Sequence, residues 1–441
     1  MKLIELIEKN EAGKELSQED CVWFVKELLN DKLKIEECET FIKGFVEKGP
    51  SVFECFCFAK AMNEGGRKIE FSTKKICVEK NSTGGYSDVV SLVATPILAS
   101  LGFAVAKMSS GEIENEIGSL DRLGLIDGFC PNLTDSEIEK NLNSVGMCFF
   151  KKPNDILPVE QKLVNLLKSC GLENNLVFLA ILIMAKKLVL PIEVFALDVR
   201  CGEGSVLKNI VDGEKFAELL IGMGKYANMK VGGMITYATE PIEKNLGIRL
   251  ELRDAILMLS RKVNYKNTEL YAVCKELVFS VLSLAGLKKS KQECELLIDE
   301  TIDSGLALEK LMQMVLFQRG EAVAFEKPNV LLPCENITNI IAEKSGYMTD
   351  VNLVQIKKAI SIMGGLKDES GKVVDDNVGI ELLVKEGKKI KKGQTLAKVY
   401  YSISNPKFAV GIRAIRDAFV IGKTVKKQVS IMKKEIADVF I

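Results

Sequence analysis

The chain of 441 residues contains no histidine and only one tryptophan. Without imidazole, no zinc-finger spacing can be completed by histidine. The 12 cysteines are scattered, and only Cys55 and Cys57 lie close together, within an apolar run of helical pattern. A four-cysteine site would need a second close pair, which the sequence lacks. We therefore expect no metal ion and interpret the cysteines as small buried side chains in a reducing compartment.

The sequence also lacks a net charge, because 60 lysines and arginines balance 60 aspartates and glutamates. This balance gives no general attraction to nucleic acid or to an anionic membrane. Basic clusters occur at residues 385–393 and 423–434, but no aromatic residues accompany them as base stacking would require. We interpret both clusters as solvated faces and expect neither nucleic acid nor a membrane as a partner.

No apolar run is long enough to cross a bilayer. The longest uncharged run, residues 89–106, contains Pro96 and is shorter than the ~20 residues that a membrane span needs. It is more typical of a buried helix followed by a strand. Residues 1–17 carry charges throughout, which is not the pattern of a signal peptide. We expect a soluble, cytoplasmic protein of two to three domains, since 47% of the residues are hydrophobic and 27% are charged.

Helical patterns dominate residues 1 to about 66. Ser17 and Asp20 have the spacing of a capping box at the start of an amphipathic helix. A later helix in this stretch ends at Gly65 and Gly66. Residues from about 155 to 190 show helical patterns again.

Between these helical stretches, short strands alternate with loops of small residues and with helices. This alternation predicts an α/β sheet with sites at the carboxyl ends of its strands, and it resumes after residue 190 up to about residue 325. From residue 376 onward, short strands with Gly387 and Gly393 at turns predict a small, mostly β end domain.

The loop "KNSTGGYSDVVSL", residues 80–92, has the composition of an anion-binding loop. Phosphate requires backbone N–H groups, hydroxyls and a cation that are presented without bulk, and the positive end of a following helix adds to them. The loop supplies these groups through Lys80, Ser82, Thr83, Gly84 and Gly85. A structural turn without a ligand is the alternative.

A second loop, residues 107–129, also follows an apolar strand and is rich in hydroxyls. It begins with Ser109 and Ser110 and reaches Ser119, which is placed to cap a helix. Because the two loops follow successive strands, we expect them to face the same crevice.

At these motifs the sequence resembles the thymidine and pyrimidine-nucleoside phosphorylase family. That family carries Lys-His-Ser-Thr-Gly-Gly and Asp-Lys-Val-Ser-Leu, where this chain has "KNSTGG" and "DVVSL". The segments "SSGEIENEIGSLDRL", "ILIMAKKLVL", "LDVRCGEGSVL" and "NVGIELLVKEGKKIKKGQTLAKV" resemble further family motifs in the same order. The resemblance covers nearly the whole chain.

The resemblance implies an α/β plus all-α fold. It divides the chain into a helical domain, residues 1–66 plus about 155–190, an α/β domain with a mixed sheet, residues 67–154 plus 191–330, and a C-terminal α+β domain, residues 340–441. It implies a homodimer formed through the helical domain. The implied reaction cleaves a nucleoside, here a pyrimidine nucleoside, with inorganic phosphate to give the free base and a pentose 1-phosphate. Phosphate is then the co-substrate, and no cofactor is required.

The resemblance assigns phosphate to Lys80, Ser82, Ser91, Ser109 and Ser119. The base side differs from the family at most positions. Asn81 stands for the family's histidine, Leu167 for its arginine and Leu182 for its serine, while Lys186 keeps its lysine. The remaining changes are Val164 for the tyrosine and Asn115 for a second histidine, and Lys168 lies next to Leu167.

Two functions stay open at this point. One is a phosphorylase with a changed base specificity, and the other is a degenerate paralogue that binds phosphate or a phosphosugar with little turnover. Single residues also have structural readings: Lys186 can end its helix, Ser119 can be a helix cap and Ser91 can bond back to its own helix. The acidic segment 111–116 is either a solvated loop or a feature that repels phosphate and attracts a cation.

Overall fold

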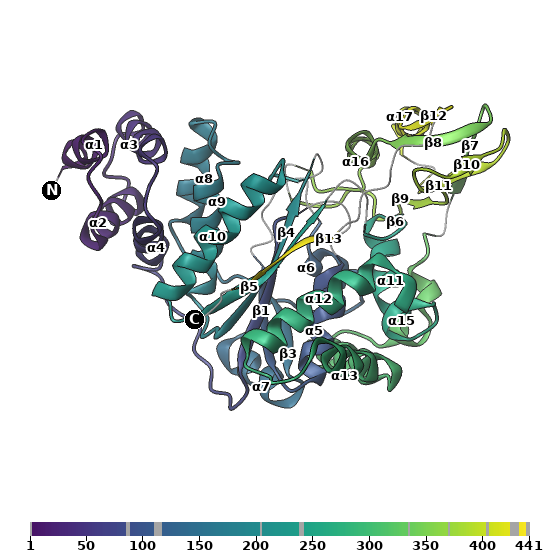
Figure 1. Ribbon diagram of the computed structural model, residues 1–441, viewed down its shortest axis with the longest axis horizontal. Coiled ribbons are helices and arrows are strands. Elements are labelled where there is room, and N and C mark those ends of the chain that lie inside the picture. Colours follow the sequence, from purple (N-terminus) through teal and green to yellow (C-terminus); the bar gives the residue numbers. More distant parts are fainter. Residues whose placement is uncertain are drawn as a thin grey trace.

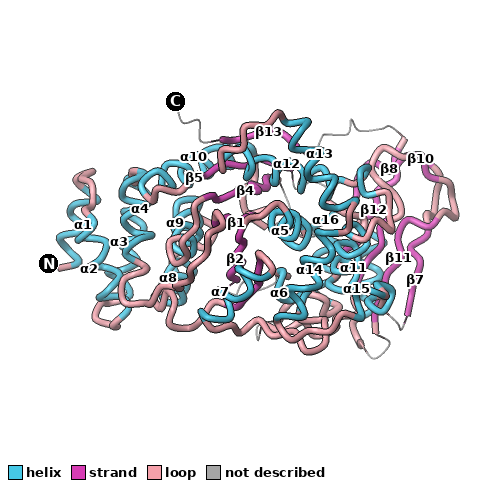
Figure 2. Tube along the Cα trace, turned by 90° about the horizontal axis from the view of Figure 1, so that it is seen from below, coloured by secondary structure: helices cyan, strands magenta, loops and turns pink. Residues whose placement is uncertain are grey.

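The computed structural model describes residues 2–84, 89–109, 117–202, 205–237, 242–333, 336–368, 371–402, 405–423 and 432–437. Helices from the N-terminal quarter form one end of the molecule, and two small antiparallel sheets form the other end (Figure 1). A large sheet flanked by helices lies between them, as a second view also shows (Figure 2). This arrangement confirms the predicted combination of helical, α/β and C-terminal α+β parts.

The helical part consists of α1 (Leu3–Glu11), α2 (Gln18–Leu29), α3 (Ile35–Lys48), α4 (Val52–Ala61), α8 (Glu160–Ser169) and α9 (Leu176–Lys187). The predicted capping box is confirmed, because the Asp20 N–H donates to Ser17 Oγ and the Ser17 N–H donates to Asp20 Oδ2. A buried aromatic group holds the helices together. Phe24, Phe45 and Phe178 belong to it, and each is at most 1% exposed.

The large sheet has the strand order β13-β5-β4-β1-β2-β3. Its strands are β1 (Cys77–Ser82), β2 (Ala104–Ser109), β3 (Met147–Lys151), β4 (Val194–Cys201), β5 (Lys230–Tyr237) and β13 (Met432–Ala437). The first five run parallel, and β13 pairs antiparallel with β5. The mixed sheet expected from the resemblance is therefore confirmed.

Both faces of the large sheet are buried, as parallel sheets require. Cys77 and Ala104 point into a core shared with the helical part, whereas Val78 and Val105 point into a second core. The helices around the sheet are α5 (Val90–Ser100), α6 (Ser119–Leu123), α7 (Asp135–Ser144), α10 (Ile210–Tyr226), α11 (Ile248–Leu259), α12 (Glu269–Leu284), α13 (Lys291–Asp303), α14 (Leu306–Phe317) and α15 (Val323–Glu326), with the 3₁₀ turns η1 (Tyr265–Asn267) and η2 (Pro328–Leu331). The run at residues 89–106 forms α5 and β2, as predicted.

The C-terminal part contains two antiparallel sheets, with orders β6-β9-β11-β7 and β10-β8-β12. Its elements are β7 (Asn336–Ile341), β8 (Gly346–Val351), α16 (Leu353–Ile362), β9 (Gly379–Leu382), β10 (Lys389–Ile390), β11 (Thr395–Tyr401), α17 (Phe408–Asp417) and β12 (Phe419–Gly422). Strand β6 (Asn245–Leu246) joins the first sheet from a distant part of the sequence. The domain boundaries given above remain predictions.

In the part of the chain that the structure describes, no helix combines the length and the apolar character needed to cross a membrane.

Candidate functional site

The candidate site lies where the order of the large sheet reverses direction. From β1 the chain continues to β2 and β3 on one side, whereas β4 and β5 lie on the other side of β1. Figure 2 shows β1 between β2 and β4. In open α/β sheets, ligands bind beyond the carboxyl ends of the strands at such a switch point. The two hydroxyl-rich segments of the sequence begin within the last residues of β1 and β2, which are neighbouring parallel strands.

Lys80 is a buried cation of this region and is only 2% exposed. Its ammonium donates to Ser91 Oγ at 3.4 Å and lies 3.7 Å from Asp198 Oδ2. Ser91 is the second residue of α5, so the positive end of this helix is directed toward the same place. The structure thus brings together Lys80 and Ser91, two residues that the sequence analysis assigned to phosphate.

Ser82 ends β1, and its hydroxyl is buried without a hydrogen-bond partner among the described residues. A buried hydroxyl that makes no hydrogen bond costs free energy, so it is suited to donate to a ligand oxygen. The neighbouring Asn81 is half-buried and donates from Nδ2 to the carbonyl of Ser82 at 2.8 Å.

Thr83 and Gly84 complete the described part of the first loop. Thr83 is tied to β4, because its N–H donates to the Asp198 carbonyl at 3.1 Å and its hydroxyl accepts from the Arg200 N–H at 2.7 Å. Gly84 has a φ of +91°, in the left-handed region that favours glycine. Gly85 lies outside the described residues.

Sequence reasoning assigned no role to two charged residues of β4, Asp198 and Arg200. Asp198 is completely buried and accepts from Thr236 Oγ1 and from Arg200 Nε, each at 3.1 Å. Arg200 is 2% exposed. Two cations, Lys80 and Arg200, therefore converge on one carboxylate at the switch point. The available signal was an aspartate and an arginine two positions apart within an otherwise apolar strand.

The second loop approaches the same sheet edge. Ser109 ends β2, and a Cβ built on Gly118 would lie 3.9 Å from Ser109 Oγ. The prediction that Ser119 caps a helix is wrong. Gly118 holds the cap position, where its N–H donates to Asp121 Oδ2 at 2.7 Å, and Ser119 is the first helical residue of α6. Without a side chain at the cap, the carboxylate of Asp121 satisfies the free N–H group. Ser110 and the acidic segment 111–116, including Asn115, lie outside the described residues.

A buried charge network joins β1 to the helical part. Glu79 is fully buried between Lys107 of β2, at 2.8 Å, and Lys187 of α9, at 2.5 Å. Burial would raise the pKa of Glu79, but the charges and hydrogen bonds of the two lysines outweigh burial and hold the pKa below its usual value. Burial lowers the pKa of Lys187 to about 8, although Glu79 acts in the opposite direction. Lys107 Nζ also donates to the carbonyl of Lys80 at 2.6 Å.

Apart from Asn81 in β1, the residues predicted to handle the base lie in the helical part. Lys186, near the end of α9, forms an ion pair with Glu160 at 2.7 Å. Leu167 is 1% exposed within the helical core, and Leu182 is half-buried against the same core. Lys168 is exposed. The binding roles of these residues, and of the residues assigned to phosphate, remain predictions.

The described ranges contain no cluster of side chains that could bind a metal ion. No group of three or more Cys, Asp or Glu side chains in them is arranged to hold a metal ion. The described cysteines are free thiols, and most of them are buried. Burial raises the pKa of Cys57, for example, to about 11, so this thiol stays protonated at neutral pH.

Comparison with known proteins identifies relatives that match most of the chain. Residues 74–308 match the model of the glycosyl transferase family, a/b domain. The pyrimidine-nucleoside phosphorylase of Staphylococcus haemolyticus is 27% identical over 406 residues, which cover 92% of this chain and 93% of that protein. A pyrimidine-nucleoside phosphorylase of Staphylococcus epidermidis is 27% identical over 401 residues, covering 91% and 92%.

Among solved structures, the anthranilate phosphoribosyltransferase of Thermus thermophilus matches with a TM-score of 0.55 and 16% identity. The match covers 71% of this chain and 99% of the chain of that enzyme. At that identity the match shows a shared fold. The family model spans more than half of the chain, and the similarity to the phosphorylases confirms the resemblance read from the sequence motifs. This chain therefore belongs to the glycosyl transferase family that is defined by this a/b domain, as a distant relative of the pyrimidine-nucleoside phosphorylases.

Proposed function

We propose that this protein is a pentosyltransferase that cleaves a pyrimidine nucleoside with inorganic phosphate. The observation that carries the proposal is the cluster of polar groups at the end of β1, which is suited to an anion. There a buried ammonium, Lys80, meets Ser91 at the start of a helix, and the buried hydroxyl of Ser82 has no described partner. The similarity to two bacterial pyrimidine-nucleoside phosphorylases supports the same activity.

In the proposed reaction, a phosphate oxygen forms a bond to the anomeric carbon of the pentose. The bond between that carbon and the base nitrogen breaks, and its electron pair leaves with the base. Phosphate is already a charged nucleophile, so its binding and orientation by Lys80, Ser82 and Ser91 supply much of the catalysis. Negative charge develops on the departing base, and the ammonium of Lys186 is the group that we assign to stabilise it.

A second candidate function is a phosphate-binding protein with little or no turnover. Three observations on the base side favour it. Lys186 already has a carboxylate partner in Glu160, Leu167 is buried in the helical core, and the chain has no histidine that could donate to the base. Loss of one donor to a developing charge commonly costs on the order of 10²–10³ in rate.

We further propose a homodimer formed through the helical part. Ile4 of α1 and Ile35 of α3 are large apolar side chains that are 54% and 57% exposed. A second copy that covers them would bury surface that is otherwise open to water.

Binding of the anion is tested by thermal unfolding in millimolar phosphate. We expect phosphate to raise the melting temperature, because a ligand that binds only the folded state stabilises it. Lys80→Met and Ser82→Ala are expected to abolish this shift, whereas Lys389→Met, which changes an exposed lysine of β10, is expected to keep it. An unmutated protein that phosphate does not stabilise would contradict both candidate functions.

Turnover separates the two candidates. The protein is incubated with phosphate and a panel of pyrimidine and purine nucleosides, and release of free base is followed by chromatography. We expect phosphate-dependent release from a pyrimidine nucleoside, and loss of that release in Lys186→Met. Phosphate binding without release from any nucleoside would overturn the enzymatic proposal in favour of the binding protein.

A further inference from the structure

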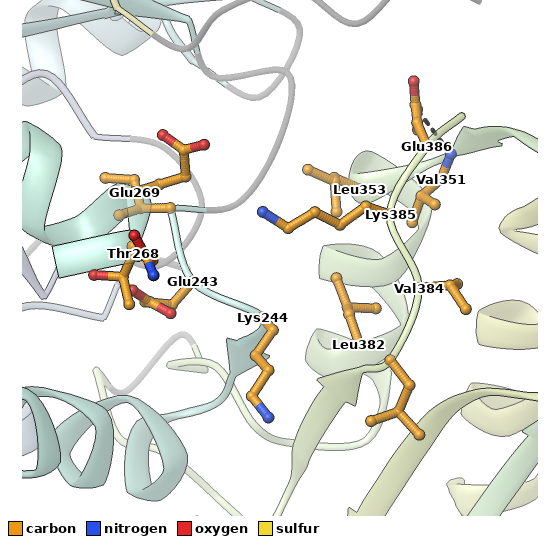
Figure 3. A pocket seen from close by; sticks show the side chains of 13 residues that line it. Glu243, Lys244, Thr268, Glu269, Val351, Leu353, Leu382, Val384, Lys385 and Glu386 are labelled. Carbon is orange, nitrogen blue, oxygen red and sulfur yellow. Dashed lines mark hydrogen bonds between the residues drawn. The ribbon is translucent and has the colours of Figure 1, made fainter. Parts of the chain in front are cut away.

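A cavity of about 290 Å³ lies between the α/β part and the C-terminal part of the chain (Figure 3). One wall is formed by residues 242–244 and 267–269, at the entry to β6 and at the start of α12. The opposite wall is formed by Val351, Leu353 and residues 382–386. None of these residues belongs to the candidate site described above. The volume lies close to the lower limit for small-molecule sites.

The two walls are hydrogen-bonded to each other. Strand β6 pairs with β9, so that Asn245 lies opposite Glu381 and Leu246 opposite Ile380. The Leu382 N–H then donates to the carbonyl of Lys244 at 2.7 Å. Because a continuous ladder joins the walls, the cavity is a fixed feature of the fold.

Aliphatic side chains form much of the cavity lining. Ile242, Leu353, Leu382 and Val384 are between 4% and 7% exposed. In the close view, Leu353 and Leu382 lie on the C-terminal side of the cavity (Figure 3). A ligand with an aliphatic group would remove further apolar surface from water here.

Several polar groups of the lining already have partners within the protein. Lys244 forms an ion pair with Glu381 at 2.8 Å. The carboxylate of Glu386 accepts from the Val351 N–H at 3.0 Å, and Thr268 Oγ1 caps α12 by accepting from the Tyr271 N–H at 3.1 Å. Because these groups already interact with other residues of the cavity walls or of α12, we do not assign them to a ligand.

Three charged residues of the lining remain. Glu243 and Glu269 stand on the α/β wall, and Lys385 extends from the other wall toward them (Figure 3). None of the three forms an ion pair with another described residue. Burial raises the pKa of Glu243, although a hydrogen bond from the Leu270 backbone and the charges of Lys385 and Lys244 act in the opposite direction. The pKa stays raised despite these partners, so a further cation next to the carboxylate would stabilise its charged form.

We propose that this cavity binds a small zwitterion with an aliphatic side chain, that is, an apolar α-amino acid. The ammonium of the ligand lies between Glu243 and Glu269, its carboxylate accepts from Lys385, and its side chain packs against Leu353 and Leu382. A zwitterion satisfies both charged walls at once, whereas a simple cation or anion would satisfy one wall and be repelled by the other.

Calorimetric titration with four compounds tests this assignment. Leucine presents both charges and the aliphatic group. Leucinamide lacks the carboxylate, 4-methylpentanoate lacks the ammonium, and glycine lacks the side chain. We expect saturable binding of leucine and at least tenfold weaker binding of each of the other three. No binding of leucine, or equal binding of leucine and leucinamide, would overturn the proposal.

Variants locate the site. Lys385 is exposed, so Lys385→Met is expected to fold normally, to bind leucine at least tenfold more weakly and to bind leucinamide as before. Glu243→Gln is expected to weaken leucine and leucinamide alike. Lys389→Met, at another exposed lysine of the C-terminal part, serves as the control and is expected to change neither. Unchanged leucine binding by Lys385→Met, with folding verified by circular dichroism, would refute the site.

Discussion

Glu79 and Lys80 are successive residues of β1 with opposite charges, and their side chains lie on opposite faces of the large sheet. Glu79 is enclosed by Lys107 and Lys187 next to the helical part, and Lys80 extends toward Ser91 and Asp198 on the other face. The position of Lys80 thus depends on charged residues to which we assign no contact with phosphate. Lys107 makes this link direct, because its ammonium contacts both the Glu79 carboxylate and the carbonyl of Lys80.

Lys187 makes the stability of the protein depend on pH in a defined range. The groups that face it are Glu79, Lys107, its neighbour Lys186 and the ring of Phe195. Its pKa falls from 10.5 to about 8 on folding, so between these values the unfolded state binds the proton and the folded state does not. Stability therefore rises with pH in this window, by about 1.4 kcal/mol per pH unit at most.

Lys187→Met removes this titration. In urea unfolding between pH 7.5 and 10.5, we expect the stability of the unmutated protein to increase relative to that of the variant as the pH rises. Lys168→Met, which changes an exposed lysine of α8, is expected to run parallel to the unmutated protein. A constant difference between Lys187→Met and the unmutated protein would show that Lys187 stays charged throughout this range.

Single residues could be predicted from the sequence where their partners are close along the chain. Lys80 and Ser91 belong to one strand–loop–helix unit, and their contact follows from that unit. Asp198, the partner of Lys80, and Lys187, the partner of Glu79, come from a strand and a helix that are far away in the sequence. No local pattern specifies which buried charges will meet. For the same reason, sequence reasoning did not find the ion pair between Lys186 and Glu160.

At the scale of elements, strong hydrophobic patterns placed the helices and strands well, because periodicity reports which face is buried. Helix α5 and strand β2 lie where the patterns predicted them, whereas α4 ends at Ala61, before the predicted stop at Gly65 and Gly66. The N-cap of α6 was predicted at Ser119, one residue after its observed position at Gly118. Serine is a frequent cap, and only the contact between Gly118 and Asp121 decides the position.

Close packing of neighbouring strands makes Gly233 of β5 essential. Its φ is +151°, and a Cβ at this position would lie 2.0 Å from the carbonyl oxygen of Leu197 in β4. We expect Gly233→Ala to lower the free energy of unfolding by roughly 2–4 kcal/mol, because the strands must separate to admit a methyl group. Chemical denaturation measures this loss.

Gly44 of α3 provides the contrast. A Cβ there would be 3.6 Å from the nearest side-chain atom, an ordinary contact, and the residue lies inside a helix. Gly44→Ala is therefore expected to stabilise the protein by about 0.5–1 kcal/mol. Similar effects of the two substitutions would mean that β4 and β5 are not packed as closely as the structure has them.

At the scale of the molecule, the sequence predicted the parts of the fold but not their connections. Parallel β–α alternation and the end-domain pattern are local signals, and the family resemblance supplied their order. Two exchanges between parts were missed. Strand β6 leaves the α/β part to pair with β9, and β13 returns from the C-terminal segment to pair with β5. Strand β6 has only two residues, too few for a periodic pattern. Strand β13 is as long as β1, but periodicity does not specify a pairing partner that is far away along the chain.

Strand β13 gives residues 432–437 a structural role at the edge of the large sheet. Strand β13 pairs with β5 from Met432 to Ala437 and occupies one edge of the large sheet. A chain that ends at residue 431 would leave β5 as an exposed edge, and unpaired edge strands promote self-association. We expect this truncation to lower the denaturation midpoint and to produce aggregates in size-exclusion chromatography. A chain that ends at residue 437 keeps β13 and is expected to behave like the full chain, whereas identical behaviour of the two truncations would show that β5 does not need this partner.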